Sequence, residues 1–329
     1  MHQPLKKSTD RKKNMLEPDF EIIGYNPDLK EVWNDFVNNS KNGTFLFNRG
    51  YMDYHADRFK DHSFIFLKKG KIRALLPATL RDDTLSSHAG LTYGGLIMDK
   101  KITVSEILEI FGLLKERCRH EGINNLIYKS IPYIYHSLPS EEDLYALFRH
   151  NATLSARGVS SVIRQSDRLK FRDIRKRGIR KAVEQGIEIT ESKDFSGFWD
   201  ILSANLQNKY SVTPVHSLEE ITMLASRFEK EIKLYTAILD GEIIAGAVCY
   251  LTGNCAHSQY ISASPKGKES GALDLLFDNL INLRLKDYAY FDFGISTEEG
   301  GRILNENLIY QKEGFGGRAV CYDTYIMKI

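Results

Sequence analysis

Tyr310 and Lys312 stand two residues apart, just before the glycine-rich turn of residues 314–317. A phenol can give a proton to a leaving group, and an ammonium can donate to a carbonyl or a phosphate. The pattern before the turn predicts a short helix, and the alternating aromatic run after it predicts a strand. Gly314 can close such a helix in the left-handed conformation, so the turn itself needs no function. The tyrosine could equally be a buried aromatic residue and the lysine a helix-end cap.

A carboxylate farther up the chain could accept a proton from an attacking amine. Asp292 lies in the run Tyr-Phe-Asp-Phe-Gly of residues 290–294. Side chains alternate along a strand, so Asp292 points to the face opposite Phe291 and Phe293, near a strand end where α/β sheets often bind ligands. The same carboxylate could instead cap an adjacent loop.

His257 and Tyr260 lie on a predicted strand of residues 256–264. In a regular strand, residues three apart face opposite sides of the sheet, so only one of them can face a given cleft unless a bulge intervenes. We interpret Tyr260 as a substrate contact and His257 as a second candidate base.

Other polar and aromatic residues could border a substrate cleft. His216 lies in a predicted loop of residues 209–217 between two helices, where binding residues often occur, although loop decoration is the simpler interpretation. In the first half of the chain, His55, His88 and Tyr93 could face a cleft between the two halves.

The order of predicted elements occurs twice. Each half has a hairpin of two alternating apolar runs, a third strand, an amphipathic helix and a further strand. In the first half these are residues 63–80, 90–98, 105–122 with Ser105 as the helix N-cap, and 123–131. In the second half they are residues 232–251 with a turn at Asp240-Gly241, then 256–264, 271–288 and 289–295, followed by a last helix and strand.

This order predicts an α/β fold with mixed, mostly antiparallel sheets flanked by helices. The length of 329 residues suits two domains, which we place at residues 18–150 and 165–329 with a junction around 150–170. The basic stretch of residues 1–17 has no apolar segment and is predicted to be a disordered tail.

The composition excludes several classes of protein. Hydrophobic residues make up 42% and charged residues 27%, which is typical of a globular chain. The net charge of +2 argues against a dedicated nucleic-acid binder, and no apolar stretch is long enough to span a bilayer, so no membrane insertion is expected. Four scattered cysteines match neither a zinc site nor a redox motif and suggest a cytoplasmic protein. No metal-ligand spacing is present, and no metal is expected.

One charged segment stands out from this balance. Arg164–Lys181 carries nine basic residues against two aspartates. Such a run is usually a solvated helix face, but it could also hold a phosphate-bearing ligand or the RNA backbone.

The order of elements and several motifs resemble the GNAT acyltransferases, and the duplication resembles their FemAB-like or BioF2-like bacterial branch. The GNAT pattern Tyr-x-Lys-x-Gly-Phe is matched from Tyr310 to Phe315, and the FemAB-like Lys-x-x-Phe-Gly pattern is matched from Lys312 to Gly316. The resemblance implies two tandem GNAT-like domains. It makes Tyr310 the acid that protonates the leaving group, Tyr260 a substrate residue, and the second domain the one that binds the donor. The first domain would then shape the acceptor site.

The resemblance also implies a loop that holds the pyrophosphate of coenzyme A through backbone N–H groups at a helix start. The corresponding residues are Lys266, Gly267, Lys268, Ser270 and Gly271. Glu269 replaces the middle glycine of the family pattern, which leaves the donor open, because a carboxylate beside a pyrophosphate is unfavourable.

The expected function is therefore an N-acyltransferase that moves an acetyl or other acyl group from coenzyme A to an amine of a sugar, amino acid or peptide. A first alternative is a FemAB-like aminoacyltransferase that takes its donor from aminoacyl-tRNA, bound through Arg164–Lys181, and modifies a peptidoglycan precursor. A second alternative is a binding module without catalysis.

Overall fold

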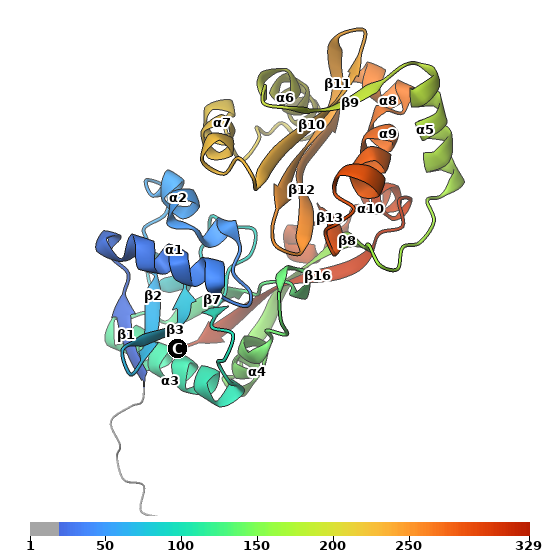
Figure 1. Ribbon diagram of the computed structural model, residues 1–329. Helices are drawn as coiled ribbons and strands as arrows, with labels where there is room; N and C mark the ends of the chain where they lie inside the picture. The colour runs from blue at the N-terminus through green and yellow to red at the C-terminus, as the bar shows by residue number, and fades with distance from the viewer. Residues whose placement is uncertain (1–19) are drawn as a thin grey trace, which may run out of the picture.

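The computed structural model describes residues 20–329, and the tail predicted for residues 1–17 lies outside them. Figure 1 shows the first half of the chain, in blue to green, beside the second half, in yellow to red, with β8 and β16 running between them. The α/β class with mixed sheets flanked by helices is confirmed.

The first half contains a small sheet and the helices that cover it. Its strands and α-helices are β1 (Phe20–Gly24), α1 (Lys30–Asn39), α2 (Arg49–Met52), β2 (Phe64–Lys68), β3 (Lys71–Leu76), β4 (Thr79–Arg81), β5 (Thr84–Ser86), β6 (Ile97–Met98), α3 (Val104–His120), β7 (Asn125–Lys129) and α4 (Glu142–Arg149). Short 3₁₀ turns are η1 (Pro27–Leu29), η2 (Phe45–Phe47), η3 (Asp53–His55) and η4 (Tyr133–Tyr135).

The second half begins with a long strand and carries the larger helices. Its elements are β8 (Thr153–Arg164), α5 (Asp173–Glu184), β9 (Glu188–Ser192), α6 (Ser196–Tyr210), α7 (Leu218–Arg227), β10 (Ile232–Leu239), β11 (Glu242–Leu251), β12 (Cys255–Ala263), α8 (Pro265–Ser270), α9 (Ala272–Asn279), the π-helical turn η5 (Leu280–Arg284), β13 (Tyr290–Ile295), β14 (Thr297–Glu298), η6 (Glu299–Gly301), β15 (Ile303–Leu304), α10 (Glu306–Glu313) and β16 (Arg318–Lys328).

One sheet runs through both halves. Its strand order is β4-β5-β7-β16-β8-β13-β12-β11-β10-β9, while β1-β2-β3-β6 form a separate sheet and β14-β15 a hairpin. The last strand makes the connection, because β16 pairs with β8 over residues 318–326 and with β7 over residues 324–328. The division at residues 150 and 165 therefore stays a prediction, with the sheet continuing across it.

Two neighbouring strands separate in the middle of this sheet. β12 and β13 pair in parallel over three residue pairs, ending at His257 and Asp292. Beyond that point β12 bulges at Gln259, because Val248 pairs with Tyr260 while the next residue of β11 pairs with Ser258. On the other strand, Gly294 takes a φ of 77°. The strands are thus held together at one end and splayed at the other.

Local signals explain most element boundaries. The hairpin of β10 and β11 turns at Asp240-Gly241, both with positive φ, as the sequence predicts. The helix over residues 104–120 begins two residues before the predicted start, because Thr103 and not Ser105 forms a capping box with Glu106. The third strand expected over residues 90–98 is reduced to β6.

The turn of residues 314–317 is built differently from the prediction. Gly314 keeps a right-handed conformation with φ of −59°, and Gly316 takes the left-handed one with φ of 93°. A Cβ on Gly316 would lie 2.7 Å from the carbonyl oxygen of Leu169, so this glycine is required for both backbone conformation and close approach. The prediction that Gly314 takes the left-handed conformation was therefore wrong by two residues.

The junction of α8 and α9 provides a test of the packing. Gly271 has a φ of 78°, and a Cβ there would lie 2.4 Å from the carbonyl oxygen of Gly178 on α5. We expect Gly271→Ala to lower the free energy of unfolding by at least about 2 kcal/mol, since strain and overlap add. Gly112→Ala in α3, where a Cβ meets nothing within 4 Å, is the matched control and should be neutral or stabilising. Equal thermal midpoints for Gly271→Ala and wild type would contradict this packing.

Candidate active site

Asp292 is a fully buried carboxylate in the centre of the large sheet. It accepts hydrogen bonds from five groups, which come from four strands and one turn. These are Ser160 Oγ, His257 Nδ1 at 2.8 Å, Tyr322 OH at 2.5 Å, Tyr135 OH at 3.1 Å and its neighbour Gly294 N at 2.9 Å. The donors surround both carboxylate oxygens, so the charge is compensated without contact to solvent.

Burial by itself would raise the pKa of Asp292, but the pKa is held well below its usual range. The attraction of His257 and the hydrogen bonds from His257, Ser160 and Tyr322 outweigh the desolvation. Burial raises the pKa of Tyr322 and Tyr135 well above the ordinary value, so both phenols stay neutral donors. Asp292 is therefore an anion that orients its partners.

The sequence predicted only part of this cluster. Asp292 faces away from Phe291 and Phe293, as its place in the alternation indicates, and His257 lies beside it on β12. Ser160, Tyr135 and Tyr322 were not among the candidates. Tyr322 lies in the aromatic alternation of the last strand, but nothing in the sequence shows that β16 pairs with β8, the strand beside β13.

The bulge decides which way His257 points. Its cross-strand neighbour is Tyr250, and that of Tyr260 is Val248, two residues away on β11. Residues two apart share a face, so the bulge places His257 and Tyr260 on the same side of the sheet. Asp292 occupies Nδ1 of His257, and within residues 20–329 no hydrogen-bond partner is found for Nε2. Such an arrangement leaves Nε2 to accept a proton.

Lys312 is buried beside this cluster, with 6% of its surface exposed. Its Nζ donates to the carbonyl oxygens of Gly294 at 2.8 Å and Ile295 at 2.9 Å, the last residues of β13. Burial lowers the pKa of Lys312 to about 8, and the charge of Asp292 acts against that shift. The ammonium thus remains the main form at neutral pH, and two main-chain carbonyls fix its position.

An apolar cavity of about 610 Å³ opens between the splayed strands and reaches Lys312. Its walls come from β12, β13 and the helices α6, α9 and α10, and include Ile261, Phe293, Leu273, Phe277, Leu308 and Lys312. The volume is within the range of about 300–1,000 Å³ that is usual for small-molecule sites. We call it the splay cavity.

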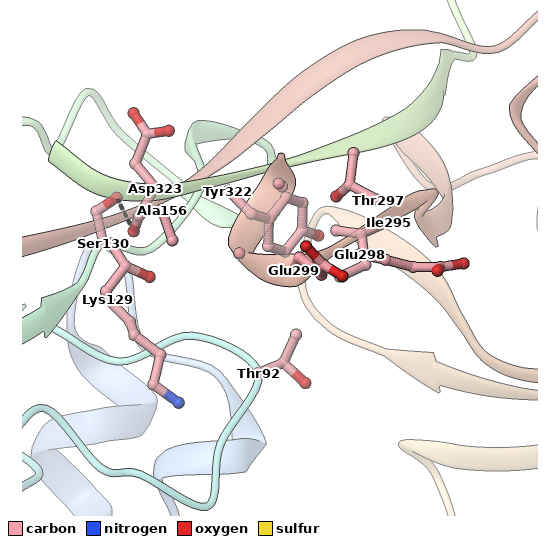
Figure 2. A pocket seen from close by; sticks show the side chains of 14 residues that line it. Thr92, Lys129, Ser130, Ala156, Ile295, Thr297, Glu298, Glu299, Tyr322 and Asp323 are labelled. Carbon is pink, nitrogen blue, oxygen red and sulfur yellow. Dashed lines mark hydrogen bonds between the residues drawn. The ribbon is translucent and has the colours of Figure 1, made fainter. Parts of the chain in front are cut away.

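A second, smaller cavity lies between the two halves of the chain, and Figure 2 shows its lining. The first half contributes Lys129, Ser130 and Thr92. The second half contributes Ile295 at the end of β13 and, after it, Thr297, Glu298 and Glu299. Tyr322 of β16 lies at its centre in the view, and its hydroxyl is the one that donates to Asp292. We call it the interdomain cavity.

The residues expected to hold a pyrophosphate are mostly used in packing. A Cβ on Gly267 would lie 2.1 Å from the carbonyl oxygen of Ile244, and Gly271 packs on α5 in the same way. Lys266 pairs with Asp240 at 3.3 Å, and Ser270 Oγ donates to the carbonyl oxygen of Gly267. Only Lys268 lines the splay cavity, where its Nζ also donates to Asn205 at 2.8 Å. Binding of a pyrophosphate here stays a prediction.

Tyr310 lies on the exposed side of α10. It is 55% exposed, and the guanidinium of Arg172 lies 4.6 Å from its ring centroid. From α10, Leu308, Gln311 and Lys312 line the splay cavity. The role of Tyr310 as the acid therefore stays a prediction, and the structure groups Lys312, and not Tyr310, with Asp292 and His257.

Most of the remaining candidates lie in or beside a stack of rings between the halves. Tyr54 stacks on His55 at 4.2 Å and on His216 at 5.7 Å, and His55 stacks on His88 at 5.3 Å. The backbone N of His216 donates to the Tyr260 hydroxyl oxygen at 3.3 Å, so this hydroxyl in turn donates to Nδ1 of His216 at 2.5 Å. Tyr93 is buried apart from this stack, against Tyr135 at 4.5 Å. These side chains join the halves, and their role as substrate contacts stays a prediction.

Comparison with known families bears on the second half. Residues 170–300 match the family described as the acetyltransferase (GNAT) domain. This segment contains His257, Asp292 and the splayed strands, and it is less than half of the chain. A search among curated proteins finds no match.

Solved structures show that the likeness extends over both halves. FemX is 10% identical, with a TM-score of 0.66 over 92% of this chain and 96% of that chain. The L-PGS of Bacillus licheniformis is 13% identical, with a TM-score of 0.60 over 91% of each chain. The C-terminal domain of a putative lysylphosphatidylglycerol synthetase from Agrobacterium fabrum is 14% identical, with a TM-score of 0.58 over 92% of each chain.

At these identities the structures show a common fold. Together with the GNAT domain, they confirm the resemblance to the GNAT superfamily, and the fold shared with FemX confirms the resemblance to the FemAB-like type as a likeness of fold. Within residues 20–329, no helix is long and apolar enough to cross a membrane, and no group of three or more His, Cys, Asp or Glu side chains is placed to hold a metal ion.

The ring stack makes a prediction for stability at acidic pH. Burial lowers the pKa of His216 to about 4, whereas the unfolded chain has the ordinary value of about 6.5. Below pH 6.5 the unfolded state therefore binds a proton at His216 that the folded state does not bind, and the free energy of unfolding falls until about pH 4. His216→Gln should remove about 3 kcal/mol of that fall between pH 7 and pH 4.

Urea unfolding at the two pH values measures this difference. His120→Gln, at an exposed position of α3, is the control and should keep the wild-type dependence. If the free energy of unfolding of His216→Gln falls between pH 7 and pH 4 by as much as that of wild type, His216 is not buried in its neutral form.

Proposed function

We propose that the protein is an N-acyltransferase that moves an acyl group from an activated donor to a primary amine. The observation that carries this proposal is the position of Lys312. Lys312 lines the splay cavity, its ammonium is fixed by the carbonyls of Gly294 and Ile295, and the charge of Asp292 raises its pKa against the effect of burial. A fixed ammonium in an apolar cavity suits the oxyanion that forms when an amine attacks an acyl carbon.

The steps follow from the neighbouring groups. The donor's acyl end enters the splay cavity, and Lys312 donates to its carbonyl oxygen. The amine nitrogen forms the bond to the acyl carbon, and Nε2 of His257 takes its proton while Asp292 holds the imidazole through Nδ1. The bond to the leaving thiol or hydroxyl then breaks, and His257 or Tyr310 supplies the proton that the leaving group needs.

We favour coenzyme A as the carrier of the acyl group. The family match to an acetyltransferase domain supports it, and so do the apolar walls of the splay cavity with Lys268 among them. The packed glycines Gly267 and Gly271 weigh against the usual pyrophosphate loop.

Aminoacyl-tRNA is the second candidate donor. The basic run predicted to bind phosphates forms α5 and the loop before it, with Arg168, Lys170, Arg177 and Arg180 exposed. α5 packs against α9, a wall of the splay cavity, so a bound tRNA end would lie near its entrance. The fold shared with FemX and with a putative lysylphosphatidylglycerol synthetase supports this donor and an acceptor of peptidoglycan-precursor or lipid type.

Substitution of Lys312 tests the proposal. Lys312→Met keeps the length and the apolar part of the side chain but removes the charge, and we expect kcat/KM to fall at least about tenfold, or about 1.4 kcal/mol of transition-state stabilisation. The measurement is thiol release from acetyl-coenzyme A with a panel of amino acids, amino sugars and short peptides. With aminoacyl-tRNA as the donor, transfer of the aminoacyl group to the same acceptors is measured instead. Lys286→Met, an exposed lysine of the same half, is the control.

An unchanged rate for Lys312→Met would remove Lys312 from the chemistry and overturn the proposal. Tyr310→Phe measured beside it assigns the leaving-group proton: slower transfer gives that role to Tyr310, and an equal rate leaves it with His257. Wild-type transfer from aminoacyl-tRNA alone would exclude coenzyme A as the donor.

A further inference from the structure

The interdomain cavity holds a lysine for which the described residues provide no carboxylate partner. Nζ of Lys129, at the end of β7, donates to the carbonyl oxygens of Leu91 at 2.5 Å and Ala89 at 3.1 Å. Burial lowers the pKa of this lysine to about 8. No ion pair to Lys129 is found in the part of the chain that the structure describes. Two neutral oxygens leave its charge uncompensated, and an anion in the cavity would balance it.

The opposite wall carries a carboxylate that could bind a cationic group. Figure 2 shows Lys129 and Thr92 on one side of the cavity and Glu298 and Glu299 on the other. Asp323, also in the lining, is engaged by Arg157 in two hydrogen bonds of 2.7 Å, and Glu298 accepts one from Asn305. For Glu299, no partner appears within residues 20–329.

The space between these charges is small and partly apolar. The cavity measures about 220 Å³, less than the roughly 300–1,000 Å³ of pockets that enclose drug-sized ligands. Ile295, Ala156 and the ring of Tyr322 line its middle. It therefore suits an amino-acid-sized group, either free or at the end of a longer molecule.

The cavity also adjoins the chemical centre. Tyr322 lines it and donates to Asp292, and Ile295 lines it while its carbonyl accepts from Lys312. A group bound here therefore lies next to residues that bond directly to Asp292 and to Lys312.

We propose that the interdomain cavity binds the acyl acceptor as a primary amine that also carries a carboxylate or phosphate. Lys129 binds the anionic group, and Glu299 binds the ammonium before it loses its proton. This inference rests on the proposed acyl transfer, since it names the acceptor class of that reaction.

Ligand-detected NMR without any acyl donor tests the assignment. Three probes are compared at the same concentration: glycylglycine with an amine and a carboxylate, O-phosphoethanolamine with an amine and a phosphate, and n-butylamine with the amine alone. We expect one of the first two to bind and n-butylamine to bind at least about tenfold more weakly, since it lacks the charge-assisted contact to Lys129. The better of the two identifies the anion.

Two variants locate the bound probe. Lys129→Gln keeps N–H donors for the two carbonyls but removes the charge, and Glu299→Gln changes an exposed side chain; each should weaken binding about tenfold. Lys101→Gln, exposed before α3, is the control and should bind like wild type. Failure of both charged probes to bind, or equal binding by Lys129→Gln, overturns the inference.

These experiments distinguish a failure of the binding inference from a failure of the proposed acyl transfer. If the probes bind through Lys129 but wild type transfers no acyl group from either donor, the proposed function falls and the binding site remains. If transfer occurs but Lys129→Gln leaves the KM for the acceptor unchanged, the proposed function stands and the acceptor site lies elsewhere.

Discussion

The account depends on the cost of burying the Asp292 carboxylate. An isolated charge in the middle of a sheet would be strongly unfavourable, so its donors must all be in place when the chain is folded. They come from β8, β12, β13, β16 and the turn η4, which span both halves of the chain. The same carboxylate therefore fixes the imidazole of His257 and links the last strand, through Tyr322, to Tyr135 of the first half.

The splay of β12 and β13 is the second constraint. Parallel pairing ends at His257 and Asp292, and beyond it a bulge at Gln259 and the left-handed Gly294 direct the strands apart. At this end of β13 the carbonyls of Gly294 and Ile295 accept hydrogen bonds from Lys312. One lysine thus satisfies the backbone and brings a positive charge to the cavity that the splay creates.

Much of this arrangement was predictable from the sequence. Alternation and turn residues predict both hairpins, and the alternation around Asp292 correctly predicts its face; the pairing of Lys312 with this site came from the family resemblance. The strand order could not be predicted, because the pairing of β16 with β8 and β7 joins residues more than 150 positions apart in the chain. Ser160, Tyr135 and Tyr322 were missed for that reason. The predicted pyrophosphate loop shows why a local motif can mislead. Glycines that fit a ligand-binding motif also fit close backbone packing, and the sequence alone does not distinguish these two uses. The structure does, because Ile244 and Gly178 lie against the two glycines.

The central claim is that the acyl carbonyl of the donor lies at Lys312, in the splay cavity. A crystal structure of the protein with acetyl-coenzyme A, or with a stable aminoacyl-nucleoside if coenzyme A does not bind, tests it most directly. We predict the acyl group inside the splay cavity, with its carbonyl oxygen within hydrogen-bond distance of Lys312 Nζ. A donor bound with its acyl carbon outside this cavity, and Lys312 still bonded only to Gly294 and Ile295, would contradict the account.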